Sequence, residues 1–195
     1  MKKLIAIVGV LAVVSAIVYT QRGHIAGQLM QIGMERLMGT DLVAELEDGL
    51  HLALCGAGGP LPAPKASGPC VAVIAGRQLF VVDSGTDSPR NLGRMGYQPG
   101  TVKAVFLTHF HSDHIDGLGE LSTLRWAGGD NTKPLPVYGP RGVERVVDGF
   151  NAAYSQDFDY RHEHHGDIVA PMSGAGMVAM PFDEPAVGEL TLVYE

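Results

Sequence analysis

The chain is poor in several kinds of residue that would point to a function. Only two of its 195 residues are cysteine and one is tryptophan, and no internal repeat or low-complexity tract is visible. The net charge is -7, and no cluster of lysine and arginine interleaved with aromatic residues occurs. Nucleic-acid binding ordinarily needs such basic clusters to neutralise phosphates. The composition therefore makes nucleic acid a weak candidate for the substrate.

The two cysteines, Cys55 and Cys70, flank a loop rich in glycine and proline. Neither has the spacing of a zinc ligand, which excludes a cysteine-based zinc site. Two interpretations of the pair stay open. Outside the cytoplasm a disulfide would close a loop of about 15 residues and contribute about 3 kcal/mol in the chain-entropy model. Otherwise the pair would be two buried thiols on neighbouring strands.

An uncharged apolar run covers residues 4–19 behind Lys2 and Lys3. A signal peptide has an apolar region of about 7–15 residues and a spanning helix needs about 20, so this length lies between them. Residues 14–16 resemble a cleavage site, but the apolar run continues beyond them. We therefore predict a signal or transmembrane anchor over residues 1–22, with the two lysines in the cytoplasm. The catalytic domain is then expected to be membrane-anchored or exported, and periplasmic in a bacterium.

Apolar residues at near-helical spacing follow this anchor. They predict an amphipathic linker helix within residues 23–47, which leads to a domain over residues 48–195. Within that domain, strands in a run are followed by helices that alternate with short strands. This order of elements is typical of layered folds that combine helices with a sheet.

The most informative segment is THFHSDHIDG at residues 108–117. It follows an apolar strand predicted over residues 102–107 and precedes a predicted helix, so rigid elements hold it on both sides. Its candidate ligands are His109, His111, Asp113 and His114. Imidazole and carboxylate are the ligands of catalytic zinc sites, which leave positions open for water and substrate. A solvated turn is the alternative, but the density of these side chains favours a metal site.

Residues 109–114, with the sequence HFHSDH, resemble the signature of the metallo-β-lactamase superfamily. Two further segments are similar to its ribonuclease Z and arylsulfatase-like branch. They are the glycine-rich loop CGAGGPLP at residues 55–62 and the strand LFVVDSG at residues 79–85. The resemblance covers roughly residues 50–155 and implies an α/β (α+β) fold. The family fold is a four-layer αββα sandwich, of which we expect only the first half here.

The resemblance also implies roles for individual residues. His109 and His111 would bind a first metal, whereas Asp113 and His114 would bind a second. Asp113 would in addition orient the attacking water or accept its proton. Asp83 would lie behind the ligands and accept hydrogen bonds from the ligand loop, with ordinary turn chemistry as the alternative. The cofactor would be one or two zinc ions, with manganese or iron as alternatives.

The later ligands of the family, two histidines and an aspartate, have no evident counterpart in the chain. The histidines that follow the motif are His162, His164 and His165. We predict that they form an exposed loop near the mouth of the site, and direct ligation is the less favoured interpretation. The chain ends within a predicted strand at residues 190–194. We therefore expect these residues to be the amino-terminal portion of a longer protein.

The ligand set predicts a metal-dependent hydrolase. A metal-bound hydroxide would cleave a small sulfate, phosphate or carboxylate ester, and two metals about 3.5–4 Å apart would hold the nucleophile and the leaving oxygen. The expected partners are a small-molecule ester and, through the amino-terminal segment, a membrane. One alternative is a ribonuclease Z-like phosphodiesterase that processes the 3′ end of transfer RNA. A second is a truncated, non-catalytic fragment.

Overall fold

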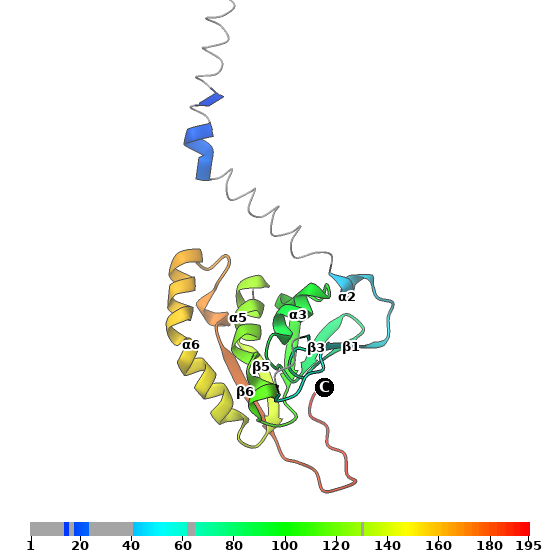
Figure 1. The fold of residues 1–195 in the computed structure, drawn as a ribbon. Helices are drawn as coiled ribbons and strands as arrows, with labels where there is room; N and C mark the ends of the chain where they lie inside the picture. The colour runs from blue at the N-terminus through cyan, green and yellow to red at the C-terminus, as the bar shows by residue number, and fades with distance from the viewer. Residues whose placement is uncertain (1–13, 16–17, 24–40, 62–64, 130) are drawn as a thin grey trace, which may run out of the picture. The chain divides into compact units, whose positions relative to one another are not determined.

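A computed structural model describes residues 14–15, 18–23, 41–61, 65–129 and 131–195 (Figure 1). The chain separates into two compact units, Met1–Thr40 and Asp41–Glu195. The described residues of the first unit are helical, and the guanidinium of Arg22 lies 4.5 Å from the centroid of the Tyr19 ring. All strands and the whole candidate site belong to the second unit.

The predicted anchor and linker lie largely outside the described residues. Of residues 1–22, the structure describes 14–15 and 18–22, and of residues 23–47 it describes Gly23 and the segment from Asp41 onward. Among these and all other described residues, no helix is both long enough and apolar enough to cross a membrane. The described end of the linker segment forms the short helix α2 (Leu42–Glu45), whose N-cap Asp41 accepts a hydrogen bond from the Val43 amide at 3.1 Å through its side chain.

The second unit combines one sheet with helices. Its elements after α2 are β1 (Leu50–Gly56), β2 (Cys70–Ala75), β3 (Gln78–Val82), α3 (Ser88–Arg94), η1 (Pro99–Thr101), β4 (Val102–Phe106), α4 (Ser112–Ile115), α5 (Leu118–Gly128), β5 (Leu135–Pro140), α6 (Val143–His165), η2 (Met172–Gly174) and β6 (Met177–Phe182). The six strands are neighbours in chain order. Strands β1 to β3 are antiparallel, whereas β3 to β6 are parallel. The predicted α/β class is confirmed.

One face of the sheet packs against α3, α5 and α6 (Figure 1). Alternate residues of a strand point to opposite faces, so the strand register brings one apolar set together on this side. Its members Ile74, Val81, Val105 and Val137 are all at most 1% exposed. Burial of such β-branched and aliphatic side chains is the main favourable contribution to the stability of the sheet.

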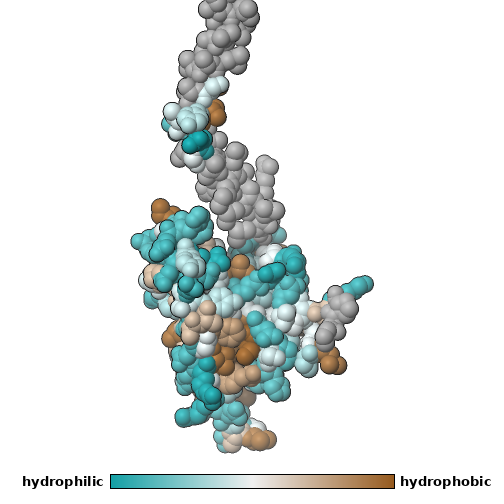
Figure 2. Space-filling model, turned by 60° about the vertical axis from the view of Figure 1, so that its left-hand side comes forward, coloured by the Kyte–Doolittle hydropathy of each residue, from teal (hydrophilic) through white to brown (hydrophobic). Residues whose placement is uncertain are grey.

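The opposite face of the sheet is apolar as well, but much of it is open. Its most exposed residues are Leu50, Leu52, Leu54, Val178 and Met180. At its centre the Tyr194 ring packs on the rings of Phe80, Phe106 and Tyr138 at centroid distances of 5.1–5.9 Å. Apolar side chains also gather on the surface of the unit in Figure 2. A sheet that is apolar on both faces belongs in a fold with layers on both sides, as in part of an αββα sandwich.

A buried arginine ties α5 to the neighbouring strands. Arg125 is 7% exposed, and its guanidinium donates hydrogen bonds to the Val102 carbonyl at 2.7 Å and the Lys133 carbonyl at 2.9 Å. Burial lowers the pKa of the Arg125 guanidinium from its ordinary value because desolvation disfavours the charged form. These two hydrogen bonds hold α5 against the start of β4 and the residues just before β5. The opposite ends of both strands lead to the candidate site.

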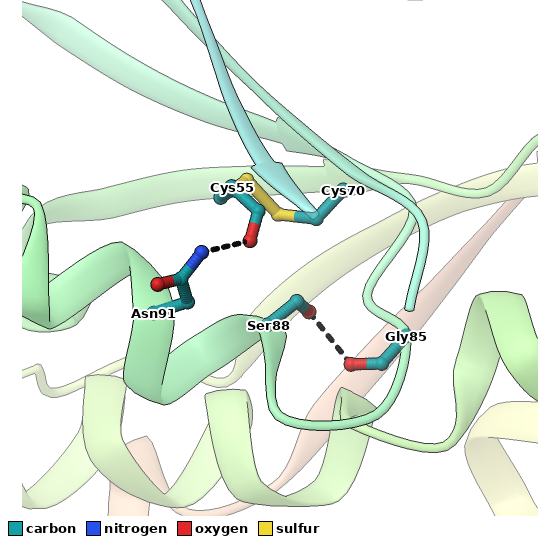
Figure 3. The surroundings of a disulfide bond; sticks show 5 residues. All are labelled: Cys55, Cys70, Gly85, Ser88 and Asn91. Carbon is teal, nitrogen blue, oxygen red and sulfur yellow. Dashed lines mark hydrogen bonds between the residues drawn. A yellow bond between two sulfur atoms is a disulfide. The ribbon is translucent and has the colours of Figure 1, made fainter. Parts of the chain in front are cut away.

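Cys55 and Cys70 form a disulfide that joins the end of β1 to the start of β2 (Figure 3). Both residues are at most 2% exposed. Asn91 of α3 donates a hydrogen bond to the Cys55 carbonyl at 2.6 Å, and the hydroxyl of Ser88 donates to the Gly85 carbonyl at 2.7 Å. The structure thus contains the disulfide and not two free thiols, and α3 holds the end of β1 beside the turn after β3.

We predict that replacing both cysteines with alanine lowers the free energy of unfolding by about 3 kcal/mol, because the crosslink restricts the unfolded chain over a loop of roughly 15 residues. Urea denaturation with and without dithiothreitol measures the effect. The midpoint of the wild-type chain should fall on reduction, while that of the double variant should not respond. A wild-type midpoint that stays constant although both thiols titrate as free would contradict the prediction.

Candidate metal centre

The site is built at the carboxyl ends of parallel strands. Val82, Phe106 and Tyr138 are register neighbours near the ends of β3, β4 and β5. Beyond them, the Asp83 amide donates to the Phe106 carbonyl at 2.9 Å and the Leu107 amide donates to the Tyr138 carbonyl at 2.8 Å. The pairing therefore extends just past the strands. It brings the turn after β3 next to the loop that carries the histidine motif.

The four predicted ligands lie together in this loop and in the short helix α4. The ring of His109 lies 4.6 Å from that of His111 and 4.0 Å from that of His114, measured between centroids. The Asp113 carboxylate is 3.6 Å from Nε2 of His114. Neutral imidazoles and a carboxylate suit zinc and related metals. In the described part of the chain, however, no group of three or more such side chains has an arrangement that could hold a metal ion.

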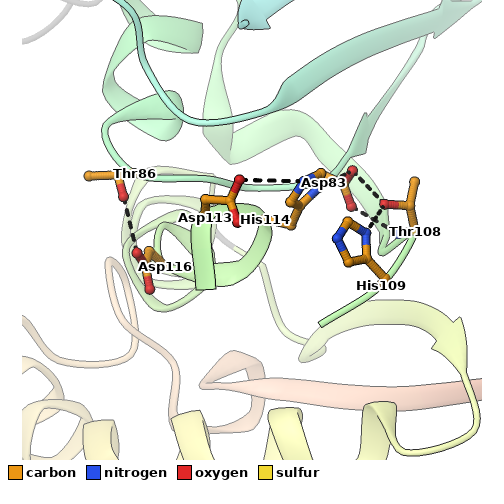
Figure 4. A network of polar contacts seen from close by, with 7 residues as sticks. All are labelled: Asp83, Thr86, Thr108, His109, Asp113, His114 and Asp116. Atoms are coloured by element: carbon orange, nitrogen blue, oxygen red, sulfur yellow. Dashed lines mark hydrogen bonds and ion pairs between the residues drawn. The ribbon is translucent and has the colours of Figure 1, made fainter. Parts of the chain in front are cut away.

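Asp83 lies behind the ligand loop and is hydrogen-bonded to both Thr108 and His114 (Figure 4). It is 5% exposed, and its carboxylate accepts hydrogen bonds at 2.8 Å from the Thr108 amide, the Thr108 hydroxyl and Nδ1 of His114. Because a carboxylate only accepts, Nδ1 of His114 carries the hydrogen, and Nε2 keeps the lone pair that a metal would need. The donor chemistry thus fits a metal, although the described donors form only part of a coordination sphere.

Close backbone contacts hold α4 against the turn after β3. The Ser84 amide donates to the His114 carbonyl, and the Gly117 amide donates to the Ser84 carbonyl, both at 2.8 Å. A methyl group on Gly85 would overlap the Asp113 carbonyl oxygen and lie 2.6 Å from the carbonyl carbon of Gly68. Glycine at position 85 therefore lets three backbone segments meet beneath the motif.

A pocket of about 830 Å³ lies beside the motif. The glycine-rich loop forms one wall, and Ser112, Asp113 and Asp116 contribute to another. Lys65 and Arg94 also line it. The pocket therefore brings two basic residues together with residues of the motif, among them the predicted ligand Asp113.

The structure corrects the interpretation of the three later histidines. His162, His164 and His165 lie in the last turn of α6 and not in a loop. Helix α6 begins at Val143, beside Gly139 and close to the Phe110 ring of the motif. Its 23 residues span about 34 Å at 1.5 Å per residue. The three histidines therefore lie at the end of α6 distant from the motif, and His162 instead contacts the Ala170 carbonyl through Nδ1 at 2.9 Å.

Sequence comparison decides the family to which this site belongs. A model of the metallo-β-lactamase superfamily matches residues 64–189, which include the complete motif. The chain belongs to the metallo-β-lactamase superfamily. Curated relatives called ribonuclease Z, from Mycolicibacterium gilvum and Mycobacterium bovis, are 37% and 38% identical over 124 residues. The matches cover 63% of this chain but 43% and 44% of those proteins, so the chain spans less than half of their length.

Solved structures of related proteins are similar to parts of the chain. The short form of human tRNase Z matches with a TM-score of 0.49 and 20% identity over 70% of this chain and 46% of that one. YhfI from Bacillus subtilis, a metallo-β-lactamase fold protein, matches with a TM-score of 0.45 and 27% identity over 53% of this chain and 41% of that one.

The ribonuclease Z relatives overturn four expectations drawn from the sequence. The prediction of a small ester as the substrate and the low rank given to nucleic acid were wrong, because these relatives are named as ribonucleases. Net charge is a poor guide to the substrate because it averages over the chain, whereas a bound phosphate responds mainly to the charges nearest to it. The expected membrane contact and the membrane-anchored or exported location are withdrawn as well, because the ribonuclease Z relatives do not support them. Membership of the superfamily supports the coarser class, a metal-dependent hydrolase.

Gly85 offers a test of the packing beneath the motif. We predict that Gly85→Ala destabilises the chain by about 1–3 kcal/mol, because the new methyl group must displace backbone that cannot rotate away. The matched control is Gly93→Ala in α3, where the nearest atom to an added Cβ is 4.0 Å away. Alanine is the better helix former, so this variant should be neutral or up to about 1 kcal/mol more stable. Urea denaturation compares the two, and equal midpoints would contradict the prediction.

Proposed function

We propose that this chain is part of a metal-dependent, ribonuclease Z-like phosphodiesterase that processes the 3′ end of transfer RNA. The observation that carries the proposal is its 37–38% identity to ribonucleases Z over 124 residues. The superfamily match over residues 64–189 supports it, because this range contains the ligand motif. The relatives are more than twice as long as the matched segment, so the activity is proposed for the complete gene product.

In this proposal His109 and His111 are ligands of a first metal, and Asp113 and His114 are ligands of a second. Zinc suits these donors, and manganese or iron are alternatives. When bound, such metals lower the pKa of water and stabilise negative charge on a phosphodiester. Further donors would have to complete each site, because the described side chains supply no group of three.

The residues of this chain have two proposed tasks besides metal binding. Asp113 would orient the attacking water or accept its proton, a role supported by its place at the wall of the 830 Å³ pocket. Lys65 and Arg94 line the same pocket and would attract a phosphate of the substrate. The Arg94 guanidinium is also paired with the carboxylate of Asp87 at 3.1 Å, and Asp87 lines the pocket as well.

The proposal is tested with His109→Ala and His111→Ala in the complete gene product. Each variant should lose bound zinc, measured by inductively coupled plasma mass spectrometry, and cleavage of precursor transfer RNA at its 3′ end. The matched control is His164→Ala at the distal end of α6, which should retain both. Wild-type protein that carries metal but leaves the precursor intact would refute the nuclease assignment. Unchanged zinc content in both histidine variants would refute the ligand assignment.

The 195-residue chain by itself should bind zinc weakly and leave precursor transfer RNA uncleaved. A stable catalytic zinc has about three protein ligands, and among the residues that the structure describes no three donors are arranged so that they could hold a metal ion. Isothermal titration with zinc and a cleavage assay on the purified chain measure both properties. Efficient cleavage that a chelator abolishes would show that the donors of this chain suffice.

A further inference from the structure

The hydroxyl of Thr108 lies between a carboxylate and a proposed metal ligand (Figure 4). Its Oγ1 is 2.8 Å from the Asp83 carboxylate and 3.0 Å from Nδ1 of His109. The Thr108 amide donates a second hydrogen bond to the other oxygen of Asp83, also at 2.8 Å. The backbone and the side chain of Thr108 are therefore both fixed on the same buried carboxylate.

The positions of the hydrogens follow from what each group can donate. A hydroxyl has one hydrogen, and an ionised carboxylate can only accept. The Thr108 hydrogen therefore points to Asp83, and a lone pair of Oγ1 faces His109. The hydrogen bond at 3.0 Å then requires that Nδ1 of His109 is the donor. A neutral His109 with hydrogen on Nδ1 has its free lone pair on Nε2, the nitrogen that remains for a metal.

We propose that Thr108 is a positioning residue for His109 and acts as a relay from Asp83. Its hydroxyl donates to Asp83 and accepts from Nδ1 of His109, which selects the tautomer that leaves Nε2 of His109 free for a metal. His114 donates to the same oxygen of Asp83 directly, through Nδ1 at 2.8 Å. One buried carboxylate thus sets the same tautomer in two histidines, once by direct contact and once through a hydroxyl. The inference rests on the proposed metal site, in which these two histidines serve different metals.

The local geometry explains why a hydroxyl is needed at this position. Asp83 follows β3 and lies level with the end of β4, where its amide bonds to the Phe106 carbonyl. Thr108 follows Phe106 by two residues, and both its amide and its hydroxyl donate hydrogen bonds to the Asp83 carboxylate. A β-branched side chain has few favourable rotamers, so threonine holds the hydroxyl in place better than serine and better than water would.

The first test measures the tautomer of His109 in the metal-free complete gene product. Two-bond correlation spectra of protein labelled with nitrogen-15 at histidine distinguish a hydrogen on Nδ1 from one on Nε2. At pH 8.5, where free imidazole is neutral, His109 should carry its hydrogen on Nδ1. The signal is assigned by its absence in His109→Ala. In Thr108→Val this preference should be lost. A wild-type His109 with hydrogen on Nε2 would overturn the proposal.

The second test compares zinc affinities by competition with a chromophoric chelator. Thr108→Val preserves shape but lacks the hydroxyl, and it should bind zinc about 10-fold more weakly, the lower end of the effect typical for groups behind a ligand. Thr108→Ser restores the hydroxyl and should recover most of the affinity. The matched control is Thr86→Val, since the Thr86 hydroxyl also donates to a nearby carboxylate, that of Asp116, at 3.2 Å. This control should bind zinc like the wild type.

Equal zinc affinities for Thr108→Val and the wild type would overturn the relay, and so would failure of Thr108→Ser to restore a loss. Neither readout depends on RNA cleavage. Wild-type protein that shows the Nδ1 tautomer and the threonine dependence but leaves precursor transfer RNA intact would refute the proposed function and retain the relay. Cleavage that persists with an unchanged His109 tautomer in Thr108→Val would retain the function and refute the relay.

Discussion

The carboxylate of Asp83 is nearly removed from water and accepts hydrogen bonds from two segments of the chain. Thr108 belongs to the loop after β4, and His114 belongs to α4. A buried charge costs free energy unless hydrogen bonds satisfy it, so these two segments and the turn after β3 stabilise one another. Asp83 also has a φ of 58°, a left-handed conformation that aspartate tolerates better than most residues. The orientation of His114, and of His109 through Thr108, thus depends on this side chain.

Close packing makes these hydrogen bonds feasible. The turn after β3 approaches the Asp113 carbonyl and the Gly68 backbone so closely that a side chain at position 85 would separate them. Gly68 belongs to the loop that the disulfide between Cys55 and Cys70 closes. The crosslink, the glycine contact and the carboxylate therefore each contribute to the geometry of the motif. The first orders the loop, the second sets its distance to the motif, and the third orients the rings within the motif.

Elements with a clear hydrophobic period were readable from the sequence. The strand predicted over residues 102–107 corresponds to β4. The end of α6 was predicted to be a loop, because His162, His164 and His165 lie among charged residues there. The strand predicted at residues 190–194 is absent, and Tyr194 packs on the sheet instead. Such contacts depend on tertiary structure, which local periodicity does not encode.

Ligand types could be read from the motif, but their supporting contacts and the substrate could not. Thr108 looks like an ordinary strand-end residue until strand pairing places Asp83 within 2.8 Å of its hydroxyl. The net charge of -7 is a poor guide to the substrate, because it too contains no information on which residues lie close together. Charges more than about 8 Å apart are largely screened at physiological ionic strength, so a phosphate responds to the groups nearest to it. In the proposed enzyme these are the metals, Lys65 and Arg94, and their local field can attract RNA to an acidic chain.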